Sequence, residues 1–134
     1  MFEKLEEEFH NIIINFSPEQ EEKFTLQCAR SCAHLINNKA VSAFLSGDET
    51  YRRKAALFVE VEYDLHNEEI VKTAAHWAAL AVFIAAGQTE NNRAWFAAMA
   101  ARNALSIGNE IVDEDIDEIY EITFEEQIAT ALLL

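Results

Sequence analysis

Residues 74–87 decide the fold. They read Ala74-Ala-His-Trp-Ala-Ala-Leu-Ala-Val-Phe-Ile-Ala-Ala-Gly87, without Asp, Glu, Lys or Arg. A second run, residues 94–101, is apolar at every position, and we expect its helix to end at Gly108. Helices without a polar face belong in the centre of a domain. We therefore predict a central antiparallel hairpin over residues 68–107, capped by Asn67, in which small alanine side chains let the helix axes come close together.

The segments before this hairpin also have helical periodicity. Residues 2–15 place apolar side chains on one face and glutamates on the other. The motif Ser17-Pro-Glu-Gln20 predicts a capping box at the start of the next helix. Gly47 is expected to end the helical region that follows, in a left-handed conformation. Asp48 or Thr50 then caps a further helix.

The segment after the hairpin is strongly acidic. Residues 110–122 mix isoleucines with acidic side chains, which favours a short acidic helix over a strand. Thr123 with Glu126 has the pattern of another capping box. We therefore expect a separate final helix that runs from there to Leu134.

These elements together predict an all-α fold, a compact bundle of about six or seven helices around the alanine-rich hairpin. Only 3 glycines and 1 proline interrupt the chain, which favours long helices over a β-sandwich. Four large side chains of the hairpin are expected to be largely buried: Trp77, Phe83, Trp95 and Met99.

Length and composition predict a single acidic helical domain, residues 1–134. A hydrophobic fraction of 51% rules out intrinsic disorder. The 10 basic and 24 acidic residues give a net charge of −14, which argues against a nucleic-acid ligand because binding a polyanion requires a basic surface. No basic start with an apolar run marks a secretory signal, and no apolar stretch reaches the ~20 residues that span a bilayer. We expect a cytoplasmic protein without a membrane partner.

The negative charge is concentrated at the two ends of the chain. Residues 1–25 hold seven acidic and two basic residues, residues 26–102 hold eight of each, and residues 103–134 hold nine acidic and no basic residue. If the ends meet in space, they form one negative face that could dock a basic protein partner. A solvated surface that aids solubility is the alternative. The predicted partner-binding residues are Asp113, Glu114, Asp115, Asp117, Glu118 and Glu121.

The two cysteines are expected to be buried free thiols. Cys28 and Cys32 lie four residues apart, on one face of a helix, where a strain-free disulfide is unfavourable. Together with His34 they could supply three zinc ligands. Their spacing is not that of a structural zinc site, however, and no second cysteine pair exists. We therefore expect no metal at this position.

Other chemical motifs are incomplete. Glu7-x-x-His10 is half of a carboxylate-bridged di-metal pattern, and no second half is present. Arg52-Arg53-Lys54 is the one basic cluster, which we expect to pair with the acidic terminal segments rather than to bind phosphate. The chain has no glycine-rich phosphate loop, nucleophile elbow or metalloprotease motif. We therefore predict no catalytic residue and no cofactor, and interpret the protein as a binding module.

Two other functions fit the same sequence. A small-molecule-binding or enzymatic bundle would place His34, His66 or His76 in a pocket. A homodimeric structural domain would use the apolar end Leu132-Leu133-Leu134 as its contact, or that end would pack against the body of the chain. Whether the histidines converge on one cavity distinguishes the first of these from a protein-binding module.

Part of the chain resembles a known family. The resemblance runs from Cys28-Ala-Arg to Gly108, about three-fifths of the chain. It is carried by Thr50-Tyr-Arg-Arg-Lys-Ala-Ala, Ala74-Ala-His-Trp-Ala-Ala and Ala94-Trp-Phe-Ala-Ala-Met-Ala-Ala-Arg-Asn-Ala-Leu. In these segments the chain is similar to the alanine-rich helical immunity proteins of bacterial toxin systems, although its acidic tail departs from them. The resemblance implies a binder without catalysis and assigns no role to single residues.

Overall fold

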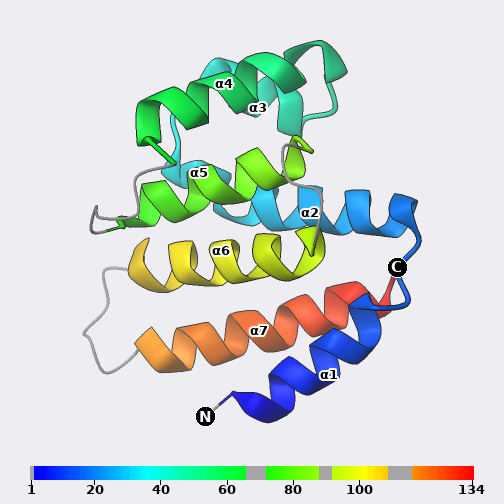
Figure 1. Cartoon of the computed structure of the whole chain (residues 1–134). Helices are drawn as coiled ribbons and strands as arrows, with labels where there is room; N and C mark the ends of the chain where they lie inside the picture. Colours follow the sequence, from blue (N-terminus) through cyan, green and yellow to red (C-terminus); the bar gives the residue numbers. More distant parts are fainter. Residues whose placement is uncertain (1, 66–71, 88–91, 109–115) are drawn as a thin grey trace.

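Helices make up most of the described chain, which comprises residues 2–65, 72–87, 92–108 and 116–134 of a computed structural model (Figure 1). Seven α-helices and two short 3-10 helices follow one another in these residues, where no strand occurs. They are α1 (Glu3–Ile13), α2 (Pro18–Cys32), η1 (Ala33–Leu35), α3 (Lys39–Leu45), η2 (Glu49–Tyr51), α4 (Arg52–Tyr63), α5 (Ala74–Ala85), α6 (Arg93–Gly108) and α7 (Ile116–Leu132). The predicted all-α fold is confirmed.

Side-chain caps determine where several helices begin and end. The Ser17 hydroxyl accepts a hydrogen bond from the Gln20 backbone N–H at 3.1 Å, and Gln20 Oε1 accepts one from the Ser17 N–H at 2.8 Å. This is the predicted capping box of α2. Asn38 caps α3 by accepting from the Val41 N–H at 3.0 Å. Gly47 follows α3 with a φ of 109°, the left-handed conformation that was predicted for it.

Two other helix starts differ from the prediction. Asp48 accepts a hydrogen bond from the Thr50 N–H at 3.1 Å, but this cap opens η2, and α4 follows it. The cap of α5 is Thr73, whose hydroxyl accepts from the His76 N–H at 3.2 Å. The predicted cap, Asn67, lies outside the described residues.

The last segment forms one long helix, whereas two helices separated by a cap were predicted. α7 runs without a break from Ile116 to Leu132, so the predicted capping box of Thr123 and Glu126 is wrong. No glycine or proline occurs in this range, and nothing else in it stops a helix once it has started. The first part of the predicted acidic helix, residues 110–115, lies outside the described residues.

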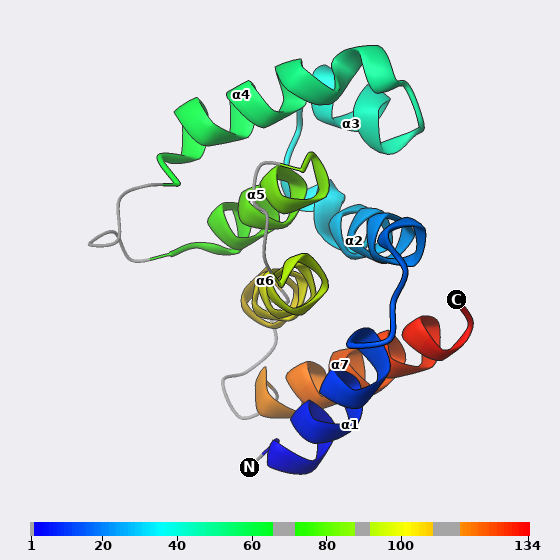
Figure 2. The same ribbon diagram turned by 45° about the vertical axis from the view of Figure 1, so that its right-hand side comes forward.

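The helices are stacked in layers (Figures 1 and 2). α5, α6 and α2 form the centre of the stack, α3 and α4 cover one end, and α1 and α7 cover the other. α6 contacts α5, α2 and α7 extensively, and it touches α1. The layer formed by α1 and α7 is therefore held to the rest of the protein mainly through α6.

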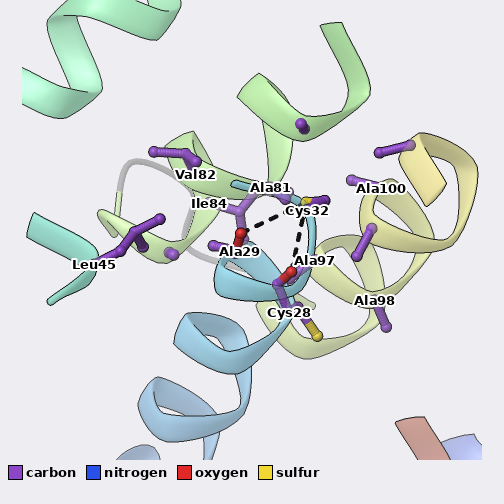
Figure 3. Packing of buried hydrophobic residues seen from close by; sticks show 14 of the residues in the cluster. Cys28, Ala29, Cys32, Leu45, Ala81, Val82, Ile84, Ala97, Ala98 and Ala100 are labelled. Carbon is purple, nitrogen blue, oxygen red and sulfur yellow. Dashed lines mark hydrogen bonds between the residues drawn. The ribbon is translucent and has the colours of Figure 1, made fainter. Parts of the chain in front are cut away.

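α5 and α6 form the predicted antiparallel hairpin (Figure 1). Their shared interface is the most extensive between any two described elements. Figure 3 shows how small its side chains are and how closely Cys28 and Cys32 of α2 approach them. The fully buried alanines of the two helices are Ala78, Ala79, Ala81, Ala85, Ala94, Ala97, Ala98, Ala100, Ala101 and Ala104. Although α5 is strongly apolar, none of the described helices has both the length and the hydropathy to cross a membrane.

The aromatic side chains of the hairpin and Met99 lie at the margin of the core and not in its centre. Trp77, Phe83, Trp95 and Met99 have most of their surface buried, as predicted, although none of them is fully buried. Alanine at the facing positions brings the helix backbones together and leaves no room for bulky groups between them. The fully buried aromatic rings come from the outer helices and α2: Phe9, Phe24, Phe44 and Phe124.

Candidate functional site

The predicted partner-binding residues fall partly on α7. Asp117, Glu118 and Glu121 lie on its first turns, and their side chains are exposed. The other three predicted residues lie outside the described part of the chain: Asp113, Glu114 and Asp115. The described half of the predicted site is thus a solvent-facing row of carboxylates on one helix.

α1 extends this acidic surface because it packs beside α7. The rings of Phe2 and Tyr120 lie 4.9 Å apart between centroids, and Phe9 meets Phe124 edge-on at 5.8 Å. Lys4 is the only lysine or arginine in either helix. Together the helices expose four carboxylates from α1 and five from α7, which we call the acidic end: Glu3, Glu6, Glu7, Glu8, Asp117, Glu118, Glu121, Glu125 and Glu126. The two acidic terminal segments therefore meet in space.

A groove of about 520 Å³ lies where the end of α1 meets the start of α6, and we call it the α1–α6 groove. Its apolar lining includes Ile13, Ile14, Phe16, Trp95 and Phe96. Ile14 is 66% exposed and Phe96 is 43% exposed, so two large apolar side chains of the groove face solvent. His10 also lines the groove, with its ring edge-on to Trp95 at 6.5 Å between centroids.

This groove was not predicted from the sequence, although one of its residues could have been. Residues 12–14 are three consecutive isoleucines, and successive positions on a helix point about 100° apart. All three cannot face the core, so one exposed isoleucine was foreseeable. Phe96 left no such signal, because it belongs to a run that is apolar at every position.

Beneath α7, α6 buries an arginine that the sequence pattern did not predict to be buried. Arg102 is only 2% exposed, and its Cζ lies 3.8 Å from the ring centroid of Phe124 and 5.1 Å from that of Tyr120. Its Nη1 donates to Gln127 Oε1 at 2.8 Å, whereas its Nε has no hydrogen-bond partner. Burial lowers the pKa of Arg102, and a hydrogen bond with Tyr120 opposes that shift. Aromatic faces and an amide thus hold this cation.

Glu22 of α2 joins two arginines from different helices. Its Oε1 accepts from Arg52 Nη2 at 2.7 Å, and its Oε2 accepts from Arg93 Nη2 at 3.0 Å. Arg52 Nη1 also donates to the Ala85 carbonyl at 3.1 Å, and Arg93 Nη2 donates to the Ile84 carbonyl at 3.2 Å. Both cations therefore lie at the carboxyl end of α5, where the helix dipole favours positive charge. The expected pairing of the basic cluster with an acidic terminal segment holds for Arg52.

Replacing Glu22 with glutamine should reduce the free energy of unfolding by about 1–2 kcal/mol at pH 7. Partial burial alone would raise the pKa of Glu22, but hydrogen bonds from Arg52 and Arg93 hold it below its ordinary value of 4.5. The carboxylate therefore contributes stability above about pH 4.5, and this contribution is lost as the pH falls through the lowered pKa. Urea unfolding of wild type and variant at several pH values tests this.

The matched control for this substitution is Glu19→Gln on the same helix. Glu19 pairs with Lys23 at 3.4 Å on the surface, so its loss should cost less than about 0.5 kcal/mol. A difference between Glu22→Gln and wild type that stays constant from pH 7 down to pH 3 would contradict the assigned role of Glu22.

The cysteines are buried free thiols, as predicted. Burial raises the pKa of both, to about 12 for Cys32. The Cys32 thiol donates to the Cys28 carbonyl at 3.5 Å within α2 (Figure 3). Thiols that stay protonated are poor nucleophiles and poor metal ligands, so these two side chains serve packing.

The three described histidines lie in different parts of the structure. His10 lines the α1–α6 groove, and His34 lies in η1, where it lines a separate cavity with Leu35. His76 is buried at the start of α5, where burial and the nearby Lys72 lower its pKa. They do not converge on one cavity, and His66 lies outside the described residues.

Two further cavities, of about 170 and 300 Å³, lie where α7 faces α6 and the segment formed by α2 and η1, and both are lined by Leu105 and Thr123. Ser31 and Gln127 line the first cavity, and His34 lines the second. The lining of the first cavity includes hydroxyl and amide groups, which can orient a small polar ligand.

The apolar carboxyl end is only partly packed against the protein. Leu132 and Leu133 are exposed, whereas Leu134 packs against the core, and its carbonyl accepts a hydrogen bond from Gln20 Nε2 at 2.7 Å. The expectation that this apolar end packs against the body of the chain is therefore confirmed for Leu134 alone of the three leucines. A role of the other two in a homodimer stays a prediction.

The described part of the chain was also searched for clusters of metal-ligating side chains. Among the described residues, no three His, Cys, Asp or Glu side chains gather in a way that could hold a metal ion.

The resemblance to bacterial immunity proteins stays a prediction. The chain matches no protein-family model, no curated protein and no solved structure.

Proposed function

We propose that this protein is a non-catalytic module that binds a basic protein partner, in the manner of an inhibitor or immunity protein for a basic toxin or nuclease. The observation that carries this proposal is the acidic end, where α1 and α7 lie side by side and expose nine carboxylates against one lysine. Charge of one sign gathered on one surface attracts a partner of the opposite sign over long range and raises its association rate.

The distribution of histidines also favours binding over catalysis. An enzymatic bundle would bring a general acid or base together with a second functional group in one cavity. His10, His34 and His76 instead occupy three separate places, and each has different neighbours. The charged surface, by contrast, continues across two helices and needs no single catalytic residue.

Association kinetics with the captured partner test the proposal. Affinity capture from the native host identifies candidate partners, and rates are then measured at increasing salt. The association rate should fall at least about tenfold between about 50 mM and about 500 mM salt, because charges farther apart than the screening length stop attracting. The dissociation rate should change much less.

Two variants of equal charge locate the effect. Glu118→Gln/Glu121→Gln removes two carboxylates from the acidic end, and Glu62→Gln/Asp64→Asn removes two from α4 and the residue that follows it, at the opposite end of the stack (Figure 1). Each takes the net charge from −14 to −12. The first should slow association several-fold at low salt and the second by less than about twofold.

Two outcomes would refute the proposal. One is a captured partner that is itself acidic. The other is an association rate that responds to neither salt nor the α7 substitutions, since the acidic end would then act only in solubility.

A further inference from the structure

The α1–α6 groove is an exposed apolar surface beside the acidic end. Ile14 and Phe96 are exposed residues of its lining, which also includes the partly buried Trp95. Large apolar side chains that gather in solvent at one place are typical of interaction sites, whereas single exposed ones are common and need no explanation. Its volume of about 520 Å³ is ample for one bulky side chain.

Carboxylates continue the groove along α1. Glu7, His10 and Ile14 are spaced by three and four residues, so they share one side of the helix. Glu7 therefore lies on the same side of α1 as the groove, and Glu21 lines the groove itself. Neither lysine nor arginine is among its lining residues in the described chain. The apolar pocket thus has an acidic margin.

We infer that this groove receives a bulky apolar side chain of the basic partner, whose flanking lysines or arginines pair with Glu7 and Glu21. The inference rests on the proposed function and identifies the part of the interface that holds the partner in place. A central apolar anchor within a rim of charges is the arrangement in which a few residues supply most of the binding free energy.

Charge complementarity selects this occupant over a second copy of the chain. Each copy carries a net charge of −14, and a copy docked here would bring its own carboxylates close to Glu7 and Glu21. Like charges brought together at an interface oppose association. A basic protein gains attraction from the same carboxylates that repel a second copy.

The two parts of the interface then control different rates. Exposed carboxylates act at long range and set the association rate. The groove acts only after contact, through removal of apolar surface from water, and sets the dissociation rate. Loss of Ile14 and Phe96 side chains should therefore shorten the lifetime of the complex without slowing its formation.

Two synthetic peptides of equal charge test the inference before the partner itself is identified. Both are amphipathic helices of about four turns. One peptide carries leucines on one face and lysines on the other, at helical spacing. The other peptide has alanine in place of every leucine. Alanine keeps the helix and the charge but supplies no bulky anchor. Binding of each dye-labelled peptide is measured by fluorescence anisotropy at low salt.

Three forms of the protein are compared. Wild type should bind the lysine–leucine peptide at least about tenfold more tightly than the lysine–alanine peptide. Ile14→Ala/Phe96→Ala should abolish that difference and leave the affinity for the lysine–alanine peptide within about twofold of wild type. The matched control Leu57→Ala/Val61→Ala truncates two exposed apolar side chains of α4 and should change neither affinity.

Tryptophan emission reports where the peptide binds. The chain has two tryptophans, so Trp77→Phe leaves Trp95 as the only one, and Trp95→Phe leaves Trp77. Emission of Trp95 should shift to the blue when the lysine–leucine peptide binds, because the indole loses contact with water. Emission of Trp77, which lies against Lys72 at 4.8 Å and does not line the groove, should not shift.

The outcomes separate this inference from the proposed function. Equal affinity of wild type for the two peptides, or a preference that survives Ile14→Ala/Phe96→Ala, would overturn the groove as the anchor site. In both cases salt-sensitive binding of the peptides would still support an acidic docking surface. Failure of wild type to bind either peptide at low salt would overturn the proposed function and this inference together.

Discussion

Phe124→Ala should reduce the free energy of unfolding by about 3–5 kcal/mol, the range for a large aromatic side chain removed from a core. Phe124 is fully buried on the inner side of α7 and meets Phe9 of α1 at 5.8 Å. Its ring also lies 3.8 Å beneath the guanidinium carbon of Arg102. The substitution therefore opens a cavity and removes an aromatic face from a buried cation. Urea unfolding followed by circular dichroism measures the loss.

A neighbouring residue on the same helix supplies the control. Ile122 is 49% exposed on the outer side of α7, so Ile122→Ala removes a similar apolar group without opening a cavity. Its cost should stay below about 1 kcal/mol. A cost of less than about 1.5 kcal/mol for Phe124→Ala would show that the layer of α1 and α7 is not joined to α6 through this ring.

Gln127→Leu should cost about 2–4 kcal/mol, a large effect for loss of one neutral side chain. Gln127 Oε1 accepts from Arg102 Nη1 at 2.8 Å, and Gln127 Nε2 donates to the Ala98 carbonyl at 3.0 Å. The Nε of Arg102 already has no partner. Leucine fills the space but has no amide oxygen. Arg102 Nη1 would therefore lose its bond to Gln127, and a second nitrogen of the buried cation would be without this partner.

The double variant Arg102→Met/Gln127→Leu separates hydrogen bonding from packing. Methionine occupies much of the same volume and carries no charge, so the penalty for an unsatisfied cation disappears. The double variant should regain at least about half of the stability that Gln127→Leu loses. Arg102→Met alone leaves Gln127 Oε1 without a donor and should cost about 1–3 kcal/mol. If the double variant is less stable than Gln127→Leu, the guanidinium stabilises this interface by more than its burial costs.

How far the sequence predicts this molecule depends on which residues carry the pattern. The hairpin was predictable because two apolar alanine-rich runs, residues 74–87 and 94–101, lie next to each other in the chain. Ser17 and Gly47 were predictable because caps act locally, between residues a few positions apart. Contacts between residues far apart in the chain were not predictable. Which side of an all-apolar helix stays uncovered depends on its neighbours, and this is why Phe96 was missed.

The candidate site was predicted in part for the same reason. Counting charges along the chain located acidity at both ends, and the structure brings α1 beside α7. The count could not show that Arg102, an ordinary cation in the sequence, lies buried between Phe124 and Gln127. The sequence also did not show that Thr123 faces inward in an unbroken helix. A capping pattern competes with continuation of the helix, and here the helix continues.

The stacked order of the helices implies an order of assembly. α5 and α6 are neighbours in the chain, so their interface forms with little loss of chain entropy, and its alanines have no rotamers to freeze. α1 and α7 come from opposite ends of the described chain, so their pairing closes the longest loop and should form late in folding. A chain emerging from the ribosome would therefore complete the hairpin before α7 exists. The proposed binding of a basic partner would then become possible only after α7 has been made and has packed beside α1.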